Sequence, residues 1–261
     1  MVRKRRPQQG IQSIEVGGTL LSALAQGRRP QMLRDLARQA DMPAAKAHRY
    51  LVSFARLGLV EQQPETGLYD LGPFALQLGL SALARLDPVT LAAAMLPELS
   101  REIGQTVALA VWANQGATIV RWLGADTPVA ASLRVGSVMP LTRSATGGAY
   151  LAFLPRETTQ SAVRKELADN QRRGLEPTTQ TAVEAFIEQT RRQGFSHTID
   201  FIPGIGGMGA PVRDHTGSMA LALVALGYSK PFEADFSHIS AAVMRSATRL
   251  SERFGAKPAC G

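Results

Sequence analysis

The sequence predicts an α+β protein in which a small helical module precedes a larger domain of strands and helices. Three short amphipathic segments and a hairpin-like stretch occupy residues 1–72, an apolar helical segment follows at 73–86, and strand-like runs alternate with helical segments over 87–261. We therefore expect a winged helix-turn-helix domain with a basic N-terminal arm, then a linker helix, then a second domain.

The positive charge of the chain is concentrated near its N-terminus. The 261 residues carry a formal net charge of +8, and residues 1–72 hold 11 Lys and Arg against 6 Asp and Glu, whereas the remaining residues hold 18 against 15. The first domain thus has an excess of +5 and the rest of the chain only +3. Such asymmetry favours a polyanionic partner for the first domain.

The sequence carries no targeting or membrane signal. The single cysteine, Cys260, excludes an intramolecular disulfide. The longest uncharged run, residues 103–120, is interrupted by polar residues and glycines, which is typical of strand and turn and not of a membrane span. The stretch after the basic start contains a glutamate and lacks a cleavage site, so it is no signal peptide. We expect a cytoplasmic protein.

The first domain begins with three helical segments. Apolar residues recur at helical spacing from Ser13 until the sequence QGRRP, and again over the short segment 31–40. The sequence AAKAHRYLVSFARLG predicts a third helix from Ala44 to Gly58, with its apolar stripe turned to the core.

The segments on either side of the third helix supply its start signal and a wing. Asp41 is expected to cap the helix, and Pro43 suits its first turn. Two strand-like pieces, 59–62 and 68–71, flank a Pro-Glu-Thr-Gly turn. Three helices and a hairpin make a winged helix-turn-helix.

The polar side chains of the third helix predict contacts with DNA. In a helix-turn-helix the second helix of the pair enters the major groove with its N-terminal half near the base edges, and Pro43, Ala44 and Ala45 keep this end slim. The side chains expected at phosphates or bases are Lys46, His48, Arg49 and Arg56. A solvated helix face is the alternative for the same residues, and the surrounding helices and wing favour DNA.

The basic arm before the first helix has two interpretations. Its cations are Arg3, Lys4, Arg5 and Arg6. They belong either to a solvated terminus or to an arm that follows phosphates into the neighbouring minor groove. We favour contact with DNA.

Several motifs together resemble the IclR family of bacterial transcriptional regulators. In the first domain they are LRDLARQADMPAAKAHRYLVSFARLGLVEQQPETGLYDLG, and further on GSVMPLTRSATGGAYLAFLP and RRQGFSHTIDFIPGIGGMGAPVRDHTGSMALALVALG. The resemblance covers residues 12–255. It implies a DNA-binding domain, a linker helix and a GAF-like effector-binding domain, assembled as a homodimer or a dimer of dimers.

The residue pattern beyond the first domain agrees with an α+β sensor. The helix at 73–86 is too apolar for a free linker, so we expect it to pack against a second copy of the chain. The elements expected after it are a helix at 88–104, strands at 106–113, 117–123 and 129–136, helices at 145–154, 156–168 and 179–193, strands at 207–214 and 218–227, and a helix at 233–254.

Three short motifs resemble enzyme or metal sites, but each lacks a feature that such a site requires. GIGGMG at 204–209 matches the dinucleotide fingerprint, but a strand follows it where a helix is needed, so we interpret it as a loop bordering a pocket or a bend between strands. Asp214 and His215 lie in a polar turn without a nucleophile. His197 and His238 lack the spacing of metal ligands. We expect no cofactor, no metal and no enzymatic activity.

The resemblance also implies an effector pocket, position by position. The matching residues here are Thr142, Ser144, Ala145, Thr146, Gly147, Asp200, Met208, Val224 and Leu226. Hydroxyls and amides at a helix start suit a carboxylate. Where family members often carry a cysteine and serines, this chain has Met208, Val224 and Leu226, which favours an apolar, aromatic acid. Asp200 suits an anionic ligand poorly, so it binds a ligand hydroxyl or a neighbouring loop instead.

The combined prediction is an effector-controlled transcriptional regulator of a catabolic operon. Its expected partners are double-stranded palindromic operator DNA, a small organic acid and a second copy of itself. One alternative is a ligand-binding enzyme with a basic interaction domain, for which residues 87–255 show no catalytic motif. Another is a DNA-compacting protein without an effector, against which the long, weakly charged second domain argues.

Overall fold

The chain divides into two compact units, Met1–Leu86 and Asp87–Gly261. The computed structural model describes residues 10–27, 29–125, 133–174 and 178–257. Each unit has a hydrophobic core of its own.

The first unit is a winged helix-turn-helix, as predicted. Its elements are α1 (Gln12–Gln26), α2 (Leu33–Gln39), α3 (Ala44–Arg56), β1 (Val60–Gln62), β2 (Tyr69–Leu71) and α4 (Pro73–Ala84). β1 and β2 pair antiparallel and form the wing. The core lies between the helices and the wing, and Leu20, Leu36 and Leu51 are fully buried in it.

The turn between α2 and α3 differs from the prediction. Pro43 occupies the N-cap position of α3, and no side chain caps this helix. Asp41 lies two residues earlier with a φ of 48°, in the left-handed region that Asp tolerates better than most residues. Asp41 as a helix cap was therefore wrong; it belongs to the turn that reverses the chain between the two helices.

The second unit is built on a five-stranded antiparallel sheet. In spatial order the strands are β4 (Gly116–Leu123), β3 (Thr106–Ala113), β7 (Met219–Tyr228), β6 (Ile205–Arg213) and β5 (Ser196–Ile202). The helices are α5 (Pro88–Ala93), α6 (Leu96–Ile103), α7 (Ala145–Phe153), α8 (Arg156–Arg172), α9 (Gln180–Gln193), α10 (Ser229–Ala234) and α11 (Phe236–Arg253). The predicted α+β class is thus confirmed.

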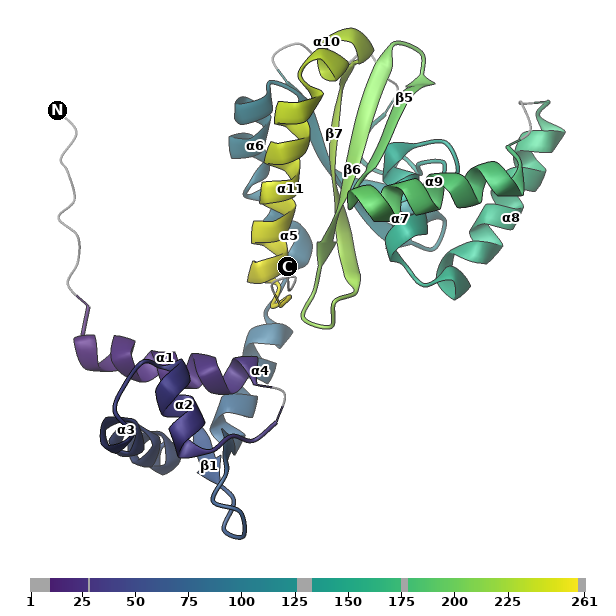
Figure 1. Cartoon of the computed structure of the whole chain (residues 1–261). Coiled ribbons are helices and arrows are strands. Elements are labelled where there is room, and N and C mark those ends of the chain that lie inside the picture. The colour runs from purple at the N-terminus through teal and green to yellow at the C-terminus, as the bar shows by residue number, and fades with distance from the viewer. Residues whose placement is uncertain (1–9, 28, 126–132, 175–177, 258–261) are drawn as a thin grey trace, which may run out of the picture. The chain divides into compact units, whose positions relative to one another are not determined.

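Helices cover both faces of this sheet (Figure 1). α6 and α11 pack together on one face, and α7 packs on the other, with α9 against its outer side. The strand registers assign side chains to these faces: Gly207 and Gly209 of β6 pair with Leu226 and Val224 of β7. Because directly paired residues share a face, all four point towards α7.

Two predicted helices are each divided in the structure. The helix predicted at 88–104 breaks after α5, because Pro97 in the first turn of α6 cannot donate the amide that a continuous helix requires. The helix predicted at 233–254 is preceded by α10 and interrupted at Asp235, which leaves α11 as the long element.

The strand predictions need three corrections. Residues 133–136 form no strand, and the rest of the predicted strand at 129–136 lies outside the described residues. β5 was not predicted, because its sequence SHTIDFI mixes polar and apolar residues without a clear alternation. The sequence GIGGMG is not a loop: Gly204 lies in the turn between β5 and β6, which agrees with a bend between strands, and the rest begins the buried strand β6.

Among the described residues, no single helix is long and apolar enough to cross a membrane. The segments Pro73–Ala84 and Pro88–Ile103 reach the necessary length and composition only when taken together across a bend.

Candidate DNA-contact helix and effector pocket

The N-terminal half of α3 presents its cations to solvent. The residues predicted to contact DNA that lie in or beside this helix are all exposed: Pro43, Ala44, Ala45, Lys46, His48, Arg49 and Arg56. Ala47 and Leu51 are fully buried and fix the opposite side of the helix to the core. The helix is therefore held by its apolar stripe while its polar residues face outwards.

The cations of α3 have no acidic partner within the described parts of the chain. No salt bridge there involves Lys46, Arg49 or Arg56. The adjoining wing carries the opposite charge, with Glu61 and Glu65 exposed. Positive charge for a polyanion thus comes from α3 and not from the wing. The arm residues Arg3, Lys4, Arg5 and Arg6 lie outside the described residues.

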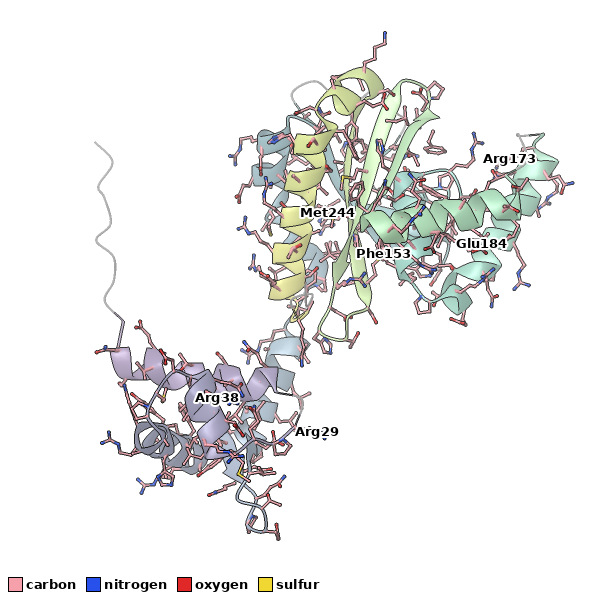
Figure 2. All side chains as sticks on the ribbon, in the orientation of Figure 1. Arg29, Arg38, Phe153, Arg173, Glu184 and Met244 are labelled. Atoms are coloured by element: carbon pink, nitrogen blue, oxygen red, sulfur yellow. The ribbon has the colours of Figure 1, made fainter. Side chains whose placement is uncertain are left out.

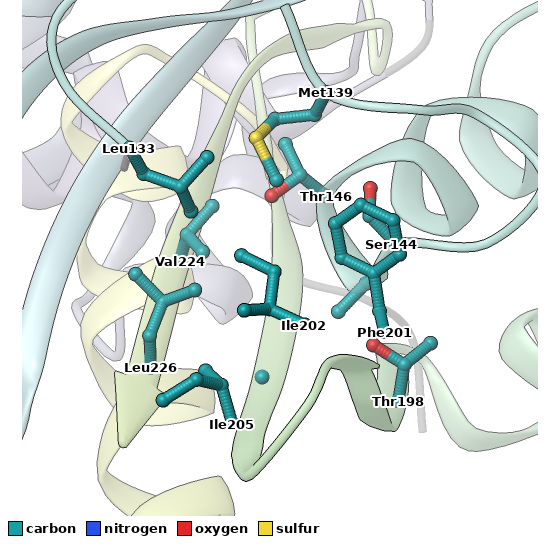
Figure 3. A pocket seen from close by; sticks show the side chains of 12 residues that line it. Leu133, Met139, Ser144, Thr146, Thr198, Phe201, Ile202, Ile205, Val224 and Leu226 are labelled. Atoms are coloured by element: carbon teal, nitrogen blue, oxygen red, sulfur yellow. The ribbon is translucent and has the colours of Figure 1, made fainter. Parts of the chain in front are cut away.

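A small apolar pocket lies where the start of α7 meets β5, β6 and β7 (Figure 3). Its lining is Leu133, Met139, Ser144, Ala145, Thr146, Thr198, Phe201, Ile202, Ile205, Gly207, Val224 and Leu226. Three hydroxyls are the polar side-chain groups, and none of these residues is charged. The cavity volume is about 20 Å³, which is room for roughly one water molecule. A larger ligand has to move the surrounding side chains apart.

Glycines of β6 create the space for this pocket. A Cβ atom on Gly207 would lie 3.7 Å from the Cβ atom of Ala145, at the start of α7. A Cβ atom on Gly209 would lie 2.7 Å from the carbonyl oxygen of the same residue, which is too close. On the opposite face, Gly206 leaves room for the ring of Phe232. The motif GIGGMG therefore serves close packing of helices on both faces of a strand, and not a phosphate site.

The start of α7 is fixed by its own cap. The Ser144 hydroxyl accepts from the amide of Gly147 at 3.0 Å and donates to the carbonyl of Pro140 at 2.6 Å. The first two amides of the helix, on Ala145 and Thr146, have no preceding helical turn to bond. Because both residues line the pocket, the positive end of the helix dipole faces the cavity.

A carboxylate on α8 holds the loop that enters α7. Glu166 accepts hydrogen bonds from the amide of Leu141 at 2.6 Å, the amide of Thr142 at 2.9 Å and the Thr142 hydroxyl at 2.6 Å. Charge-assisted bonds of this kind are stronger than neutral ones. The arrangement fixes α8 to the loop between Met139 and Ser144, two residues that line the pocket, and no sequence motif pointed to it.

The predicted effector residues separate into two groups. Five line the pocket, namely Ser144, Ala145, Thr146, Val224 and Leu226. The other four do not line it: Thr142 bonds Glu166, Gly147 packs against Pro140 and Leu141, Met208 is buried on the opposite face of the sheet, and Asp200 is exposed.

Asp200 stabilises a loop between β5 and β6. Its carboxylate accepts from the amide of Gly204 at 2.9 Å and from the hydroxyl of Ser229 at 2.7 Å. Its φ of 58° places the residue in the left-handed region. Of the two roles predicted for Asp200, these bonds match the second, a hydrogen bond to a neighbouring loop.

Sequence reasoning missed the part of the lining that comes from β5. Thr198, Phe201 and Ile202 belong to this strand or its end. The signal that could have revealed them is the pairing of β5 with the glycine-rich strand β6. Thr198 lies opposite Gly207, so both residues face the pocket.

The polar turn around Asp214 and His215 is structural. The Asp214 carboxylate accepts from the amides of Thr216 and Ser218 and from the Thr216 hydroxyl, which closes the hairpin between β6 and β7. Within the described residues, no three His, Cys, Asp or Glu side chains lie close enough together to hold a metal ion.

Comparison with known proteins decides the family. The model for the "IclR helix-turn-helix domain" matches residues 13–64, and the model for "Bacterial transcriptional regulator IclR C-terminal" matches residues 80–252. The chain belongs to the IclR family of bacterial transcriptional regulators. The predicted resemblance is thereby confirmed, and the family is one of regulators and not of enzymes.

Curated relatives of this IclR-family protein match most of its length. It is 30% identical over 256 residues to a glycerol operon regulatory protein of Streptomyces griseus, with 94% of this chain and 97% of the relative covered. It is 28% identical over 194 residues to the transcriptional repressor IclR of Escherichia coli, with 71% and 68% covered.

Two solved structures share the fold of this chain. HmgR of Pseudomonas aeruginosa superposes with a TM-score of 0.86 at 34% identity, covering 95% of this chain and 99% of that one. The repressor BlcR of Agobacterium tumefaciens superposes with a TM-score of 0.77 at 21% identity, covering 96% and 100%, and at that identity the likeness concerns the fold alone.

Proposed function

We propose that this IclR-family regulator binds a palindromic operator as a homodimer and that a small organic acid in the pocket beside α7 controls this binding. The observation that carries the proposal is the exposed, unpaired set of cations on the helix that a helix-turn-helix inserts into the major groove. The pocket in the second unit supplies a place for the effector.

The DNA-binding mode follows from α3. Lys46 and Arg49 reach base edges or phosphates, His48 contacts a base or phosphate, and Arg56 contacts the backbone. Pro43, Ala44 and Ala45 allow close approach. Arg3, Lys4, Arg5 and Arg6 form an arm that enters the adjacent minor groove. Two copies of α3 on a twofold axis read the two halves of a palindrome.

The homodimer forms through α4. None of the residues of this helix is buried, although it is strongly apolar. Its exposed side chains include Phe74, Leu76, Leu78, Leu80 and Leu83. A continuous apolar surface of this kind marks an interaction site, and a second copy of the same helix matches it in chemistry. The dimer-of-dimers alternative adds a second interface of the same kind.

The effector is an aromatic or similarly apolar organic acid. The lining offers aliphatic side chains and one phenyl ring for an apolar body, and hydroxyls with the first amides of α7 for a carboxylate. Thr142, Gly147, Asp200 and Met208 act around this site and not in direct contact with the ligand. The ligand acts by binding the two arrangements of the dimer with different affinity.

The regulator acts in the bacterial cytoplasm, and the genes that it controls form a catabolic operon. Relatives are described as regulators of a glycerol operon and as an acetate operon repressor, which supports control of genes for small carbon compounds. The specific compound differs between relatives, so the lining of this pocket is the better guide to the ligand.

The recognition helix is tested with Arg49→Ala. A lost side-chain contact to a base costs about 1–3 kcal/mol, so affinity for operator DNA should fall by about tenfold or more, with a smaller loss on a scrambled duplex. Fluorescence anisotropy measures both. Arg192→Ala, an exposed cation on α9, is the matched control. Operator binding that Arg49→Ala leaves unchanged would exclude α3 as the reading helix.

The effector is tested by calorimetric titration with benzoate-type acids against pyruvate and glyoxylate. Aromatic acids should bind the wild-type protein, and Gly207→Ala should weaken them by about tenfold, because its methyl group fills the pocket at ordinary contact distances. Binding of pyruvate or glyoxylate without any aromatic acid would contradict the predicted ligand class while leaving the DNA contacts intact.

A further inference from the structure

A second, larger hollow lies between α8 and α9, outside the sheet and away from the effector pocket. Its volume is about 410 Å³, and none of its lining residues is shared with the pocket beside α7. This volume lies within the usual range for small-molecule sites, roughly 300–1,000 Å³. α8 makes few contacts with its neighbours and packs chiefly on α7, so the groove between the two helices stays open.

The floor of the groove is apolar. It consists of Leu151 from α7, Val163 from α8, and Val183 and Ile187 from α9. Leu151 and Val183 are almost wholly buried, with 3% and 2% of their surface exposed, so the floor is fixed by the core beneath it. Of the four, Ile187 is the one that is partly exposed, so an apolar body in the groove displaces water chiefly from this side chain, at a favourable free energy.

The rim of the groove carries more positive than negative charge. Arg156, Arg164 and Arg191 line it together with Glu184. The Glu184 carboxylate is already engaged, since it accepts from the Arg156 guanidinium at 2.7 Å and from the Gln180 amide at 2.9 Å. Figure 2 shows Glu184 on the side of α9 that faces α8.

Two of the three arginines keep uncompensated charge. Arg191 donates from Nε to the carbonyl of Ala152 at 2.9 Å, a neutral acceptor that orients its guanidinium without neutralising it. Arg164 forms no ion pair or hydrogen bond with any described residue. The groove therefore presents two unpaired cations above an apolar floor.

We propose that the groove between α8 and α9 is a second ligand site, for a small carboxylate with an apolar body. The carboxylate pairs with Arg164 and Arg191, and guanidinium groups bind carboxylates through paired, charge-assisted hydrogen bonds. The apolar body lies on Leu151, Val163, Val183 and Ile187. The site goes beyond the proposed effector pocket, because it uses other residues and other chemistry.

The test is calorimetric binding of 4-phenylbutyrate and octanoate to the full chain without DNA. Both carboxylates should bind, and Arg164→Gln should weaken them by about fivefold, the loss expected for one partly solvated ion pair. Gln160→Glu adds a negative charge to the rim and should weaken the binding of both carboxylates more than Arg164→Gln does. The uncharged 4-phenylbutan-1-ol should bind more weakly than the matching acid.

Matched variants separate this site from the effector pocket. Lys165→Gln removes the neighbouring cation of α8, which lines a different hollow, and should leave the affinity unchanged. Gly207→Ala narrows only the effector pocket, so it should weaken any carboxylate binding there and leave unchanged the binding component that Arg164→Gln weakens. The proposal is overturned if neither carboxylate binds at millimolar concentration, or if Gly207→Ala abolishes binding that Arg164→Gln does not affect. Because no DNA is present, the outcome is independent of operator recognition.

Discussion

Two helices of nearly equal apolar character have opposite environments in this protein. α4, with the sequence PFALQLGLSALA, has no buried residue, whereas eight of the nine residues of α7, ATGGAYLAF, are buried. Neither sequence separates polar from apolar residues onto distinct faces. A helix that is apolar all round is stable in water only when other structure covers it. Within the part of the chain that the structure describes, α7 has that cover and α4 does not.

The cover of α7 depends on small residues and specific anchors. The glycines of β6 let the helix approach the sheet, and the hydroxyl of Tyr150 donates to the carbonyl of Ala110 at 2.6 Å. Burial raises the pKa of this tyrosine, so the hydroxyl stays protonated as a donor. Among the described residues of the first unit α4 has no comparable anchor, which is why we assign its cover to a second copy of the chain.

α7 and α4 should differ most in how a glycine-to-alanine substitution changes the free energy of unfolding. In Gly147→Ala the new Cβ atom would lie 2.2 Å from the carbonyl oxygen of Pro140, and we expect a loss of about 3 kcal/mol in the free energy of unfolding. In Gly79→Ala nothing lies within 4 Å, and better helix propensity should add up to about 1 kcal/mol. Chemical denaturation followed by circular dichroism measures both; equal effects would contradict the comparison.

Polar substitution of α4 should break the dimer and spare the fold. Leu76→Gln combined with Leu80→Gln removes two exposed leucines, which in a dimer interface contribute about 3 kcal/mol together. The dimer dissociation constant should therefore rise by about 100-fold. Sedimentation velocity measures this, with Gln77→Asn on the same helix as the control. A double variant that dimerises as well as wild type would rule out α4 as the interface.

Removal of the Glu166 charge should loosen the loop that leads into α7. Glu166→Gln replaces one of the two acceptor oxygens by an NH2 group that can only donate, and the loss of a charge-assisted bond costs about 2 kcal/mol. We expect lower stability and weaker effector binding, by denaturation and calorimetry. Glu188→Gln, an exposed carboxylate of α9, should change neither. Effector affinity that stays at the wild-type value would show that the loop does not position the pocket.

The smallest expected effect is a change in the pH dependence of stability, and it comes from the face of the sheet opposite α7. His197 stacks on Phe236 with ring centroids 4.0 Å apart, and burial lowers its pKa, although Glu233 opposes this shift. The folded state therefore favours the neutral ring. The stability due to this histidine is complete above the unfolded value of about 6.5 and decreases as the pH falls below it.

His197→Phe should make unfolding less sensitive to pH between about 7 and 5. His48→Gln, which changes an exposed histidine of α3, should leave the pH dependence as it is in the wild type. The same pH profile for His197→Phe and wild type would exclude the buried ring as its source.

The fold of the first unit was predicted well because its helices and hairpin are determined by residues that are close together in the sequence. The apolar stripe of α3, with Ala47 and Leu51 in the core, and the short hairpin after it are both determined by nearby sequence. The prediction that Asp41 caps α3 was wrong because Pro43, two residues later, takes the N-cap position. That choice depends on the path of the turn, which composition does not reveal.

The pocket was predicted only in part because it is formed by residues far apart in the chain. The α7 and β7 positions were found through family resemblance, whereas Thr198 and Phe201 of β5 become part of the lining only through pairing with β6. The Glu166 bonds join residues 24 and 25 positions apart, so no motif predicts them. That the second unit is GAF-like stays a prediction.

The most direct test of the account is fluorescence anisotropy of the full chain on its own upstream intergenic DNA and on a scrambled duplex, across a salt series, with and without aromatic acids. The account predicts saturable, sequence-selective binding that weakens with salt and changes when one acid is added. Absence of binding to either duplex at low salt would mean that the cations of α3 form only a solvated surface, and would contradict the account.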